Sequence, residues 1–152
     1  MLEKFVPNTF VGNHDVTRIA SKVGADGALA ALAILMTVGG IPSIYYGDEQ
    51  GYTGVKEERF GGDDDVRPAL PSGSDDFSPL GQRFLRAHQN LIGLRRRNPW
   101  LVDATTKVLS LDNKRMVYES RSRAGDERVQ VEIDVTDTPT AVVRDASGTV
   151  TL

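Results

Sequence analysis

The stretch Phe10-Val11-Gly12-Asn13-His14-Asp15 decides the fold, because it joins an apolar run directly to three polar side chains. An apolar segment that ends at glycine and continues into an amide, an imidazole and a carboxylate is typical of a strand that leaves a core. In α/β barrels the carboxyl ends of the strands carry the chemistry. The sequence therefore predicts a buried strand over residues 5–11 and an active-site edge at Asn13, His14 and Asp15. The alternative is that Asn13 or Asp15 only caps a helix.

A helix and a second strand follow this stretch. Helix-forming apolar residues predict a helix over 28–38, with Asp26 as its cap and Gly39-Gly40 as its stop. β-branched and aromatic residues predict a strand over 41–46, and polar residues follow it at 47–51. The order strand, helix, strand predicts parallel strands joined by a right-handed crossover. Neighbouring parallel strands end at one surface, so we expect both polar clusters to face a common cleft.

Both polar clusters resemble signatures of the α-amylase family (glycoside hydrolase family 13). Residues 10–15 resemble the strand-seven motif that ends in Asn-His-Asp, and residues 40–51 resemble the strand-eight signature. The two occur in the right order, with one helix of the right size between them. The resemblance implies an α/β fold in which residues 1–102 form the C-terminal quarter of a (β/α)8 TIM barrel, strands 7 and 8 with their helices.

The second half of the chain begins with a long polar loop over residues 51–78. Ser78 and Pro79 are typical of a helix start, and the helix is expected to end at Asn98-Pro99. His88 lies beside the apolar stripe of this helix, and we interpret it as structural or exposed. The stripe consists of residues at helical spacing: Leu80, Phe84, Ala87, Leu91 and Leu94.

The last third of the chain predicts a small antiparallel β domain over residues 103–152. Apolar and polar residues alternate through residues 127–135, which indicates one buried and one wet face. Turn residues separate the segments. The expected strands cover residues 107–111, 115–121, 127–135, 140–144 and 149–152.

The resemblance also implies roles for four side chains. Asp15 matches the carboxylate that binds sugar hydroxyls and stabilises the transition state, and His14 matches the histidine that hydrogen-bonds the sugar. Asn13 supports this geometry, and Arg67 lies where many relatives carry an arginine that lines the sugar pocket. The alternative for Arg67 is an exposed loop arginine.

No metal site is expected in this chain. Asp63-Asp64-Asp65 places three adjacent carboxylates together, which repel and lack the alternating spacing of a calcium loop. No cofactor is expected either, although calcium remains possible in the full-length protein.

The implied activity is that of a retaining α-glucan-active glycoside hydrolase. Such enzymes need a nucleophile and a general acid about 5 Å apart, and in this family they come from strands four and five. A full barrel needs about 250 residues, so we expect the isolated 152-residue chain to be inactive. Its expected partners are an α-linked oligo- or polysaccharide and the missing N-terminal part of the barrel.

Two alternatives to a hydrolase stay open. One is an α-glucan transferase or isomerase of the same family, since acceptor choice depends on loops outside this segment. The other is a non-catalytic carbohydrate-binding module, in which Tyr45, Tyr46, Tyr52 and Trp100 stack on sugar.

Composition excludes several classes of protein. The net charge of -3 argues against nucleic acid as a partner, and the absence of cysteine rules out disulfides and thiolate zinc sites. The uninterrupted apolar run is too short to span a bilayer, so no membrane partner is expected. The absence of cysteine and of a signal-peptide pattern at the start favours the cytoplasm, but a missing amino terminus would hide a signal.

Overall fold

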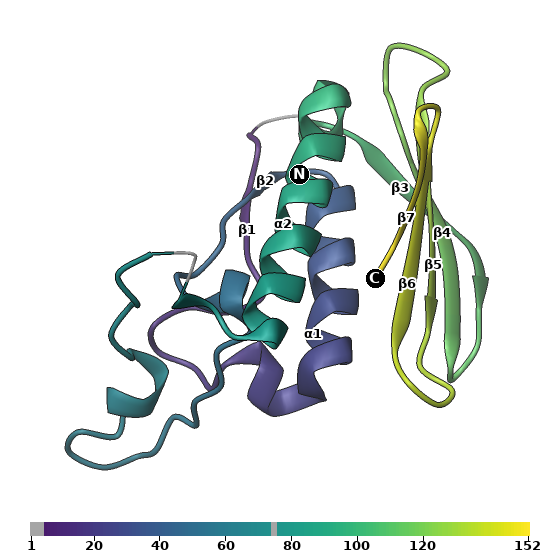
Figure 1. Cartoon of the computed structure of the whole chain (residues 1–152). Coiled ribbons are helices and arrows are strands. Elements are labelled where there is room, and N and C mark those ends of the chain that lie inside the picture. The colour runs from purple at the N-terminus through teal and green to yellow at the C-terminus, as the bar shows by residue number, and fades with distance from the viewer. Residues whose placement is uncertain (1–4, 74–75) are drawn as a thin grey trace.

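The computed structural model describes residues 5–73 and 76–152, which form three layers (Figure 1). A short parallel pair of strands lies on one side of two helices, and an antiparallel sheet lies on the other. The pair is β1 (Asn8–Thr9) with β2 (Ile41–Pro42), and the helices are α1 (Ile19–Thr37) and α2 (Pro79–Arg97). Short 3-10 helices within the described residues include η1 (Asp48–Gln50), η2 (Asp64–Val66) and η4 (Pro99–Val102).

The parallel pairing of β1 with β2 confirms the predicted direction of the two strands. Asn8 lies opposite Ile41 and Thr9 lies opposite Pro42. The predicted lengths, residues 5–11 and 41–46, are wrong, because each strand has only two residues. The predicted burial is wrong too, since Phe10 is 56% exposed. Each strand has one neighbour among the described residues, so a second row of hydrogen bonds and a covering layer are absent there.

Helix α1 is longer than the sequence predicts, because it continues N-terminally across a break at Gly24. Gly24 takes φ 74° and ψ 173°, a conformation that glycine adopts without a steric penalty. Asp26 is therefore inside the helix and not at its cap, and its carboxylate lies 2.7 Å from Arg83 Nη1. The helix ends where the Val38 N–H donates to Ile34 O at 3.1 Å.

The apolar surface of α1 faces the protein core. By length and composition alone this helix is able to cross a membrane, and 44% of its most apolar window is buried. It packs against α2 and against two strands of the antiparallel sheet, β5 (Arg128–Asp134) and β6 (Thr140–Asp145). An apolar helix that packs on protein along part of its surface in this way is typical of a core helix that further protein covers.

Helix α2 begins as predicted. The Ser78 Oγ accepts a hydrogen bond from the Gly81 N–H at 3.1 Å, and Pro79 occupies the first turn. The apolar stripe is buried at Phe84, Ala87, Leu91 and Leu94, whereas Leu80 is 43% exposed. His88 is buried, with its Nδ1 2.9 Å from Phe84 O, so the structural interpretation of this histidine is the right one.

The C-terminal sheet is an antiparallel meander in the order β3-β4-β5-β6-β7. Its strands agree with the predicted ones apart from one or two residues at their ends: β3 (Thr105–Leu111), β4 (Arg115–Arg121), β5 (Arg128–Asp134), β6 (Thr140–Asp145) and β7 (Gly148–Thr151). Val129, Val131 and Val143 are fully buried in one hydrophobic cluster with residues of α1 and α2. The division of the chain at residues 102 and 103 stays a prediction.

Candidate functional site

The Asn13–Asp15 segment follows β1 after residues 10–12, and the Asn13 side chain holds it in a turn. The Asn13 Oδ1 accepts the Asp15 N–H at 2.8 Å, and the His14 Nε2 lies 3.2 Å from the Asp15 Oδ2. The side chains of His14 and Asp15 are 60% and 62% exposed, so a ligand has access to both. Residue 18 occupies the N-cap of α1 without a side-chain cap bond, so the helix-cap interpretation of Asn13 and Asp15 is wrong.

Arg67 reaches this segment from the long loop. Its Nη2 donates to His14 O at 3.2 Å and lies 3.4 Å from Asp15 Oδ1. The same nitrogen lies 2.8 Å from Asp63 Oδ2. The structure thus brings Asn13, His14, Asp15 and Arg67 together, although Arg67 is 52 positions away from Asp15 in sequence.

Asp63 lies between two cations. Its carboxylate contacts the Lys56 ammonium and the Arg67 guanidinium. The Lys56 hydrogen bond holds the pKa of Asp63 below its usual value, with burial opposing and Arg67 adding to the effect. Among residues 5–73 and 76–152, no group of three or more histidine or acidic side chains is arranged to hold a metal ion. The Asp63 carboxylate is thus paired with Lys56 and Arg67.

Arg18, a buried arginine that the sequence analysis missed, is hydrogen-bonded to the residue that precedes Arg67. The side chain of Arg18 has no solvent exposure and pairs with Asp48, at 3.0 Å between Nη1 and Oδ1. Nη1 also donates to Tyr46 O at 2.8 Å, while Nε and Nη2 donate to Val66 O at 3.2 and 2.9 Å. Burial raises the pKa of the Asp48 carboxyl, and Arg18 opposes that shift. A carboxylate just after an apolar segment was the signal that a cation had to be near.

The Arg18–Asp48 pair shows that the two polar clusters meet. Arg18 follows β1, whereas Tyr46 and Asp48 follow β2. A Cβ atom placed on Gly12 would lie 3.8 Å from the Asp48 Oδ2. The predicted adjacency of the clusters at the carboxyl ends of two parallel strands is therefore confirmed, and the common cleft between them stays a prediction.

Three tyrosine rings surround the Arg18 guanidinium. The Arg18 Cζ lies 4.5 Å from the ring centroid of Tyr45, 5.3 Å from that of Tyr46 and 5.8 Å from that of Tyr52. These are cation–π distances, which suit a desolvated guanidinium. The rings that the sequence suggested for sugar stacking are thus engaged with a buried cation.

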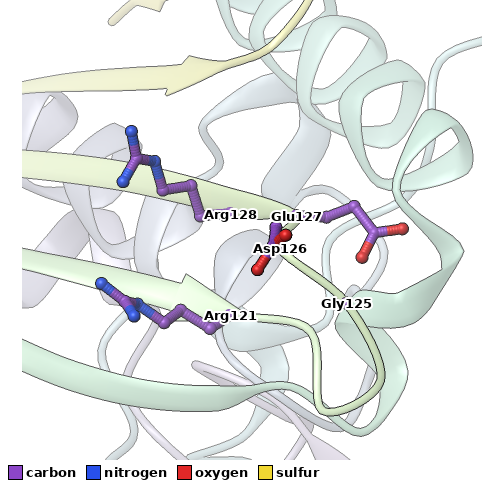
Figure 2. A pocket seen from close by; sticks show the side chains of 5 residues that line it. All are labelled: Arg121, Gly125, Asp126, Glu127 and Arg128. Atoms are coloured by element: carbon purple, nitrogen blue, oxygen red, sulfur yellow. The ribbon is translucent and has the colours of Figure 1, made fainter.

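A separate pocket of about 380 Å³ lies at the turn between β4 and β5 (Figure 2). Arg121 and Arg128 point to one side of it, and Asp126 and Glu127 come from the turn itself. The pocket belongs to the C-terminal sheet. Its lining residues lie between positions 121 and 128, and neither Asp15 nor Arg67 is among them. The candidate site is therefore the open edge at β1 and β2 and not this pocket.

Sequence comparison relates this chain to known proteins. The family profile described as "Alpha amylase, catalytic domain" matches residues 1–126. Cyclomaltodextrin glucanotransferase of Bacillus licheniformis is 33% identical over 135 residues, 88% of this chain and 17% of that protein. The same enzyme of Bacillus sp. (strain 1011) is 35% identical over 114 residues, 74% of this chain and 14% of that protein.

Solved structures agree with these sequence matches. The ligand-free cyclic α-maltosyl-(1→6)-maltose hydrolase of Arthrobacter globiformis superimposes with a TM-score of 0.70 at 25% identity. That match covers 95% of this chain and 34% of the other. The chain therefore spans only a small part of the length of the relatives that it matches.

Proposed function

The chain belongs to the α-amylase family, and from this premise we propose that it supplies strands seven and eight of a (β/α)8 barrel in a retaining α-glucan-active glycoside hydrolase. The observation that carries the proposal is the meeting of Asp15, His14 and Arg67 where β1 ends. In such barrels, residues at this end of the strands bind substrate. The proposed substrate is an α-linked oligo- or polysaccharide.

Each proposed role follows from the charge that develops during glycoside hydrolysis. The transition state carries positive charge at the anomeric carbon, and hydrogen bonds to sugar hydroxyls strengthen there. Asp15 supplies a fixed anion for that charge and accepts hydrogen bonds from hydroxyls. His14 hydrogen-bonds the sugar beside the cleaved bond, and Asn13 holds the turn through the Asp15 N–H.

Arg67 binds substrate oxygen atoms in this proposal. Its side chain is 42% exposed, its Nη2 contacts Asp15 and Asp63, and its Nε donates to His14 O at 3.3 Å, which leaves Nη1 without a protein partner among the described residues. The fork of Arg67 therefore offers further N–H groups to a sugar ring. No cofactor or metal takes part in the proposal, because the side chains named here act by hydrogen bonding and charge alone.

The isolated chain is expected to be inactive, because the nucleophile and the general acid of the family lie on strands four and five. The test is to incubate the purified 152-residue chain with maltooligosaccharides and to measure new reducing ends. The expected result is no turnover above the buffer blank. Turnover by this chain that disappears in an Asp15→Asn variant would contradict the proposed division of labour.

Transfer to a second sugar is the second candidate activity. The observation in its favour is that curated relatives at 33–35% identity are named cyclomaltodextrin glucanotransferases. In an enzyme that holds this segment and the rest of the barrel, product analysis separates the two activities. Cyclic or lengthened glucans indicate transfer, and shortened linear glucans alone indicate hydrolysis.

A stand-alone carbohydrate-binding module is the weaker alternative. The rings of Tyr45, Tyr46 and Tyr52 face Arg18, and the Trp100 Nε1 donates to Asn98 Oδ1 at 3.2 Å. Titration of the chain with maltooligosaccharides, followed by Trp100 fluorescence, tests this alternative. A saturable change in emission would support the module, whereas we expect none.

A further inference from the structure

We propose that Arg18 is a positioning residue. It fixes residues 52–67, the first part of the long loop, and thereby sets Arg67 against His14 and Asp15. The inference rests on the proposed function only for the identity of the ligand at that edge. The geometry behind it involves residues of this chain alone. It therefore is testable without any sugar.

The anchor is the fork of the Arg18 guanidinium on one carbonyl. Nε and Nη2 donate to Val66 O at 3.2 and 2.9 Å, in a fully buried setting. The Tyr45 hydroxyl donates to the same oxygen at 3.3 Å. A carbonyl that accepts from a buried cation in this way is held more firmly than one that accepts from a neutral donor. Arg18 thus fixes the end of η2.

Arg67 follows Val66 in the chain, so the anchor controls where the Arg67 side chain starts. The Arg67 N–H donates to Asp64 O at 3.1 Å, which closes η2 next to the anchored carbonyl. From that point the guanidinium reaches His14 O and Asp15 Oδ1. A small displacement of Val66 would break these contacts. Their donor–acceptor distances, 3.2 and 3.4 Å, are already at the long end of the hydrogen-bond range.

The other end of the loop is tied to the same helix start. The Arg18 N–H donates to Gly54 O at 3.0 Å, and the Gly54 N–H donates to Ser21 Oγ at 2.8 Å. The Lys56 N–H donates to Thr17 Oγ1 at 3.0 Å. Between these ties Phe60 is fully in solvent, whereas Gly62 and Val66 are buried. The loop therefore owes its position to the start of α1, with Arg18 at the centre.

The shape of the guanidinium is what the loop requires. Arg18→Lys keeps a cation beside Asp48 but loses the planar fork that meets Val66 O and Tyr46 O together. The matched control is Arg95→Lys. Arg95 is also partly buried and donates to four carbonyls, those of Met36, Val38, Gly40 and Leu101, which lie at and beyond the end of α1 and not in the long loop.

The experiment uses the two histidines of the chain as probes. His14 touches Arg67 through its backbone, whereas His88 is buried in α2, so the imidazole NMR signals report the site and an internal reference. We expect Arg18→Lys to move the His14 signal in the same direction as Arg67→Ala does, and to leave the His88 signal in place. In the Arg67→Ala background, Arg18→Lys should add no further change at His14.

Hydrogen exchange of the dilute chain gives the second readout. Arg18→Lys should speed amide exchange in residues 52–67 by about tenfold or more, while exchange in β5 stays as in the parent chain. Arg95→Lys should leave exchange in residues 52–67 unchanged. If Arg18→Lys unfolds the chain, Tyr45→Phe removes the other donor to Val66 O and should change both readouts in the same direction by a smaller amount.

The inference is overturned if the His14 signal and the loop exchange stay as in the parent chain in a folded Arg18→Lys variant. It is also overturned if Arg95→Lys changes the His14 signal and the exchange of residues 52–67 in the same way, because the loss of any buried arginine would then loosen the whole chain. Neither result touches the proposed function. Conversely, failure of Asp15→Asn to change the activity of a complete barrel would remove the function and leave the loop anchor standing.

Discussion

The guanidinium of Arg18 and the carboxylate of Asp48 lie 3.0 Å apart, in a pair whose side chains are 0% and 9% exposed. One residue follows the first parallel strand and the other follows the second, so the pair joins the two polar clusters on which the proposed site is built. Removal of one member would leave a buried charge without its partner, which is far more costly than loss of a surface pair.

The first prediction concerns this pair. Arg18→Met should lower the free energy of unfolding by about 3–5 kcal/mol, because Asp48 then remains buried without a cation. Asp48→Asn should also be costly, because Arg18 then remains buried without its carboxylate partner. The double variant should lose less than the sum of the two, and urea unfolding of all four proteins measures this coupling. Strictly additive losses would mean that the pair does not act as a unit.

The second prediction concerns the close packing of the long loop. A Cβ on Gly54 would lie 2.2 Å from Asp65 O, so Gly54→Ala has to push the loop apart and should cost about 1–3 kcal/mol. The control is Gly73→Ala, where a Cβ meets nothing within 4 Å and the change should stay within about 0.5 kcal/mol. Urea unfolding gives both values, and trypsin cleavage after Lys56 reports loosening of the loop. Equal stability of the two variants would refute the packing argument.

The third prediction concerns alkaline pH. Tyr118 is buried, its hydroxyl lies 2.6 Å from Thr37 Oγ1, and burial raises its pKa from 10.0 to about 12. A group whose pKa is higher in the folded state contributes stability below its unfolded pKa and loses it as pH rises toward the folded value. Between about pH 10 and 12, the folded chain should therefore lose about 3 kcal/mol through this residue.

The measurement for Tyr118 is the pH dependence of urea unfolding in the parent chain and in Tyr118→Phe. The variant lacks the ionising group, so its stability should fall less steeply above about pH 10. Tyr45, whose pKa is also raised by burial, is present in both proteins and cancels in the difference. The same slope in both proteins would show that Tyr118 ionises as freely in the folded chain as in the unfolded one.

Local signals in the sequence predicted several elements well. Ser78-Pro79 placed the start of α2, and alternation through residues 127–135 placed β5, because capping and strand periodicity depend on near neighbours in the chain. The Asn13–Asp15 edge was found because the order strand, helix, strand determines which ends of the strands meet. The contact of Arg67 with that edge was suggested only by resemblance to a family.

Other features depended on contacts that no local pattern reveals. The Arg18–Asp48 pair joins residues 30 positions apart, so the position of Asp48 after an apolar segment suggests a nearby cation but does not identify Arg18 as that cation. Gly24 allowed α1 to continue toward its N-terminus at a point where the sequence suggested a start at Asp26. The strands were predicted too long because their bounds followed residue type alone, whereas strand length depends on pairing, and β1 and β2 each have one neighbour among the described residues.

The central claim is that Asp15 stands at the sugar-binding edge of an α-glucan-active barrel. The most direct measurement replaces the matching segment of the Bacillus licheniformis glucanotransferase with residues 5–126 of this chain, and compares turnover of an α-glucan with and without Asp15→Asn. An Asp26→Asn graft is the control, because Asp26 pairs with Arg83 on the helices.

We expect the graft to turn over glucan, the Asp26→Asn graft to stay within a few-fold of it, and the Asp15→Asn graft to lose at least about 100-fold in kcat, as expected for a group that stabilises transition-state charge. A graft that melts cooperatively but has no activity would contradict the account. So would a graft whose activity survives Asp15→Asn unchanged.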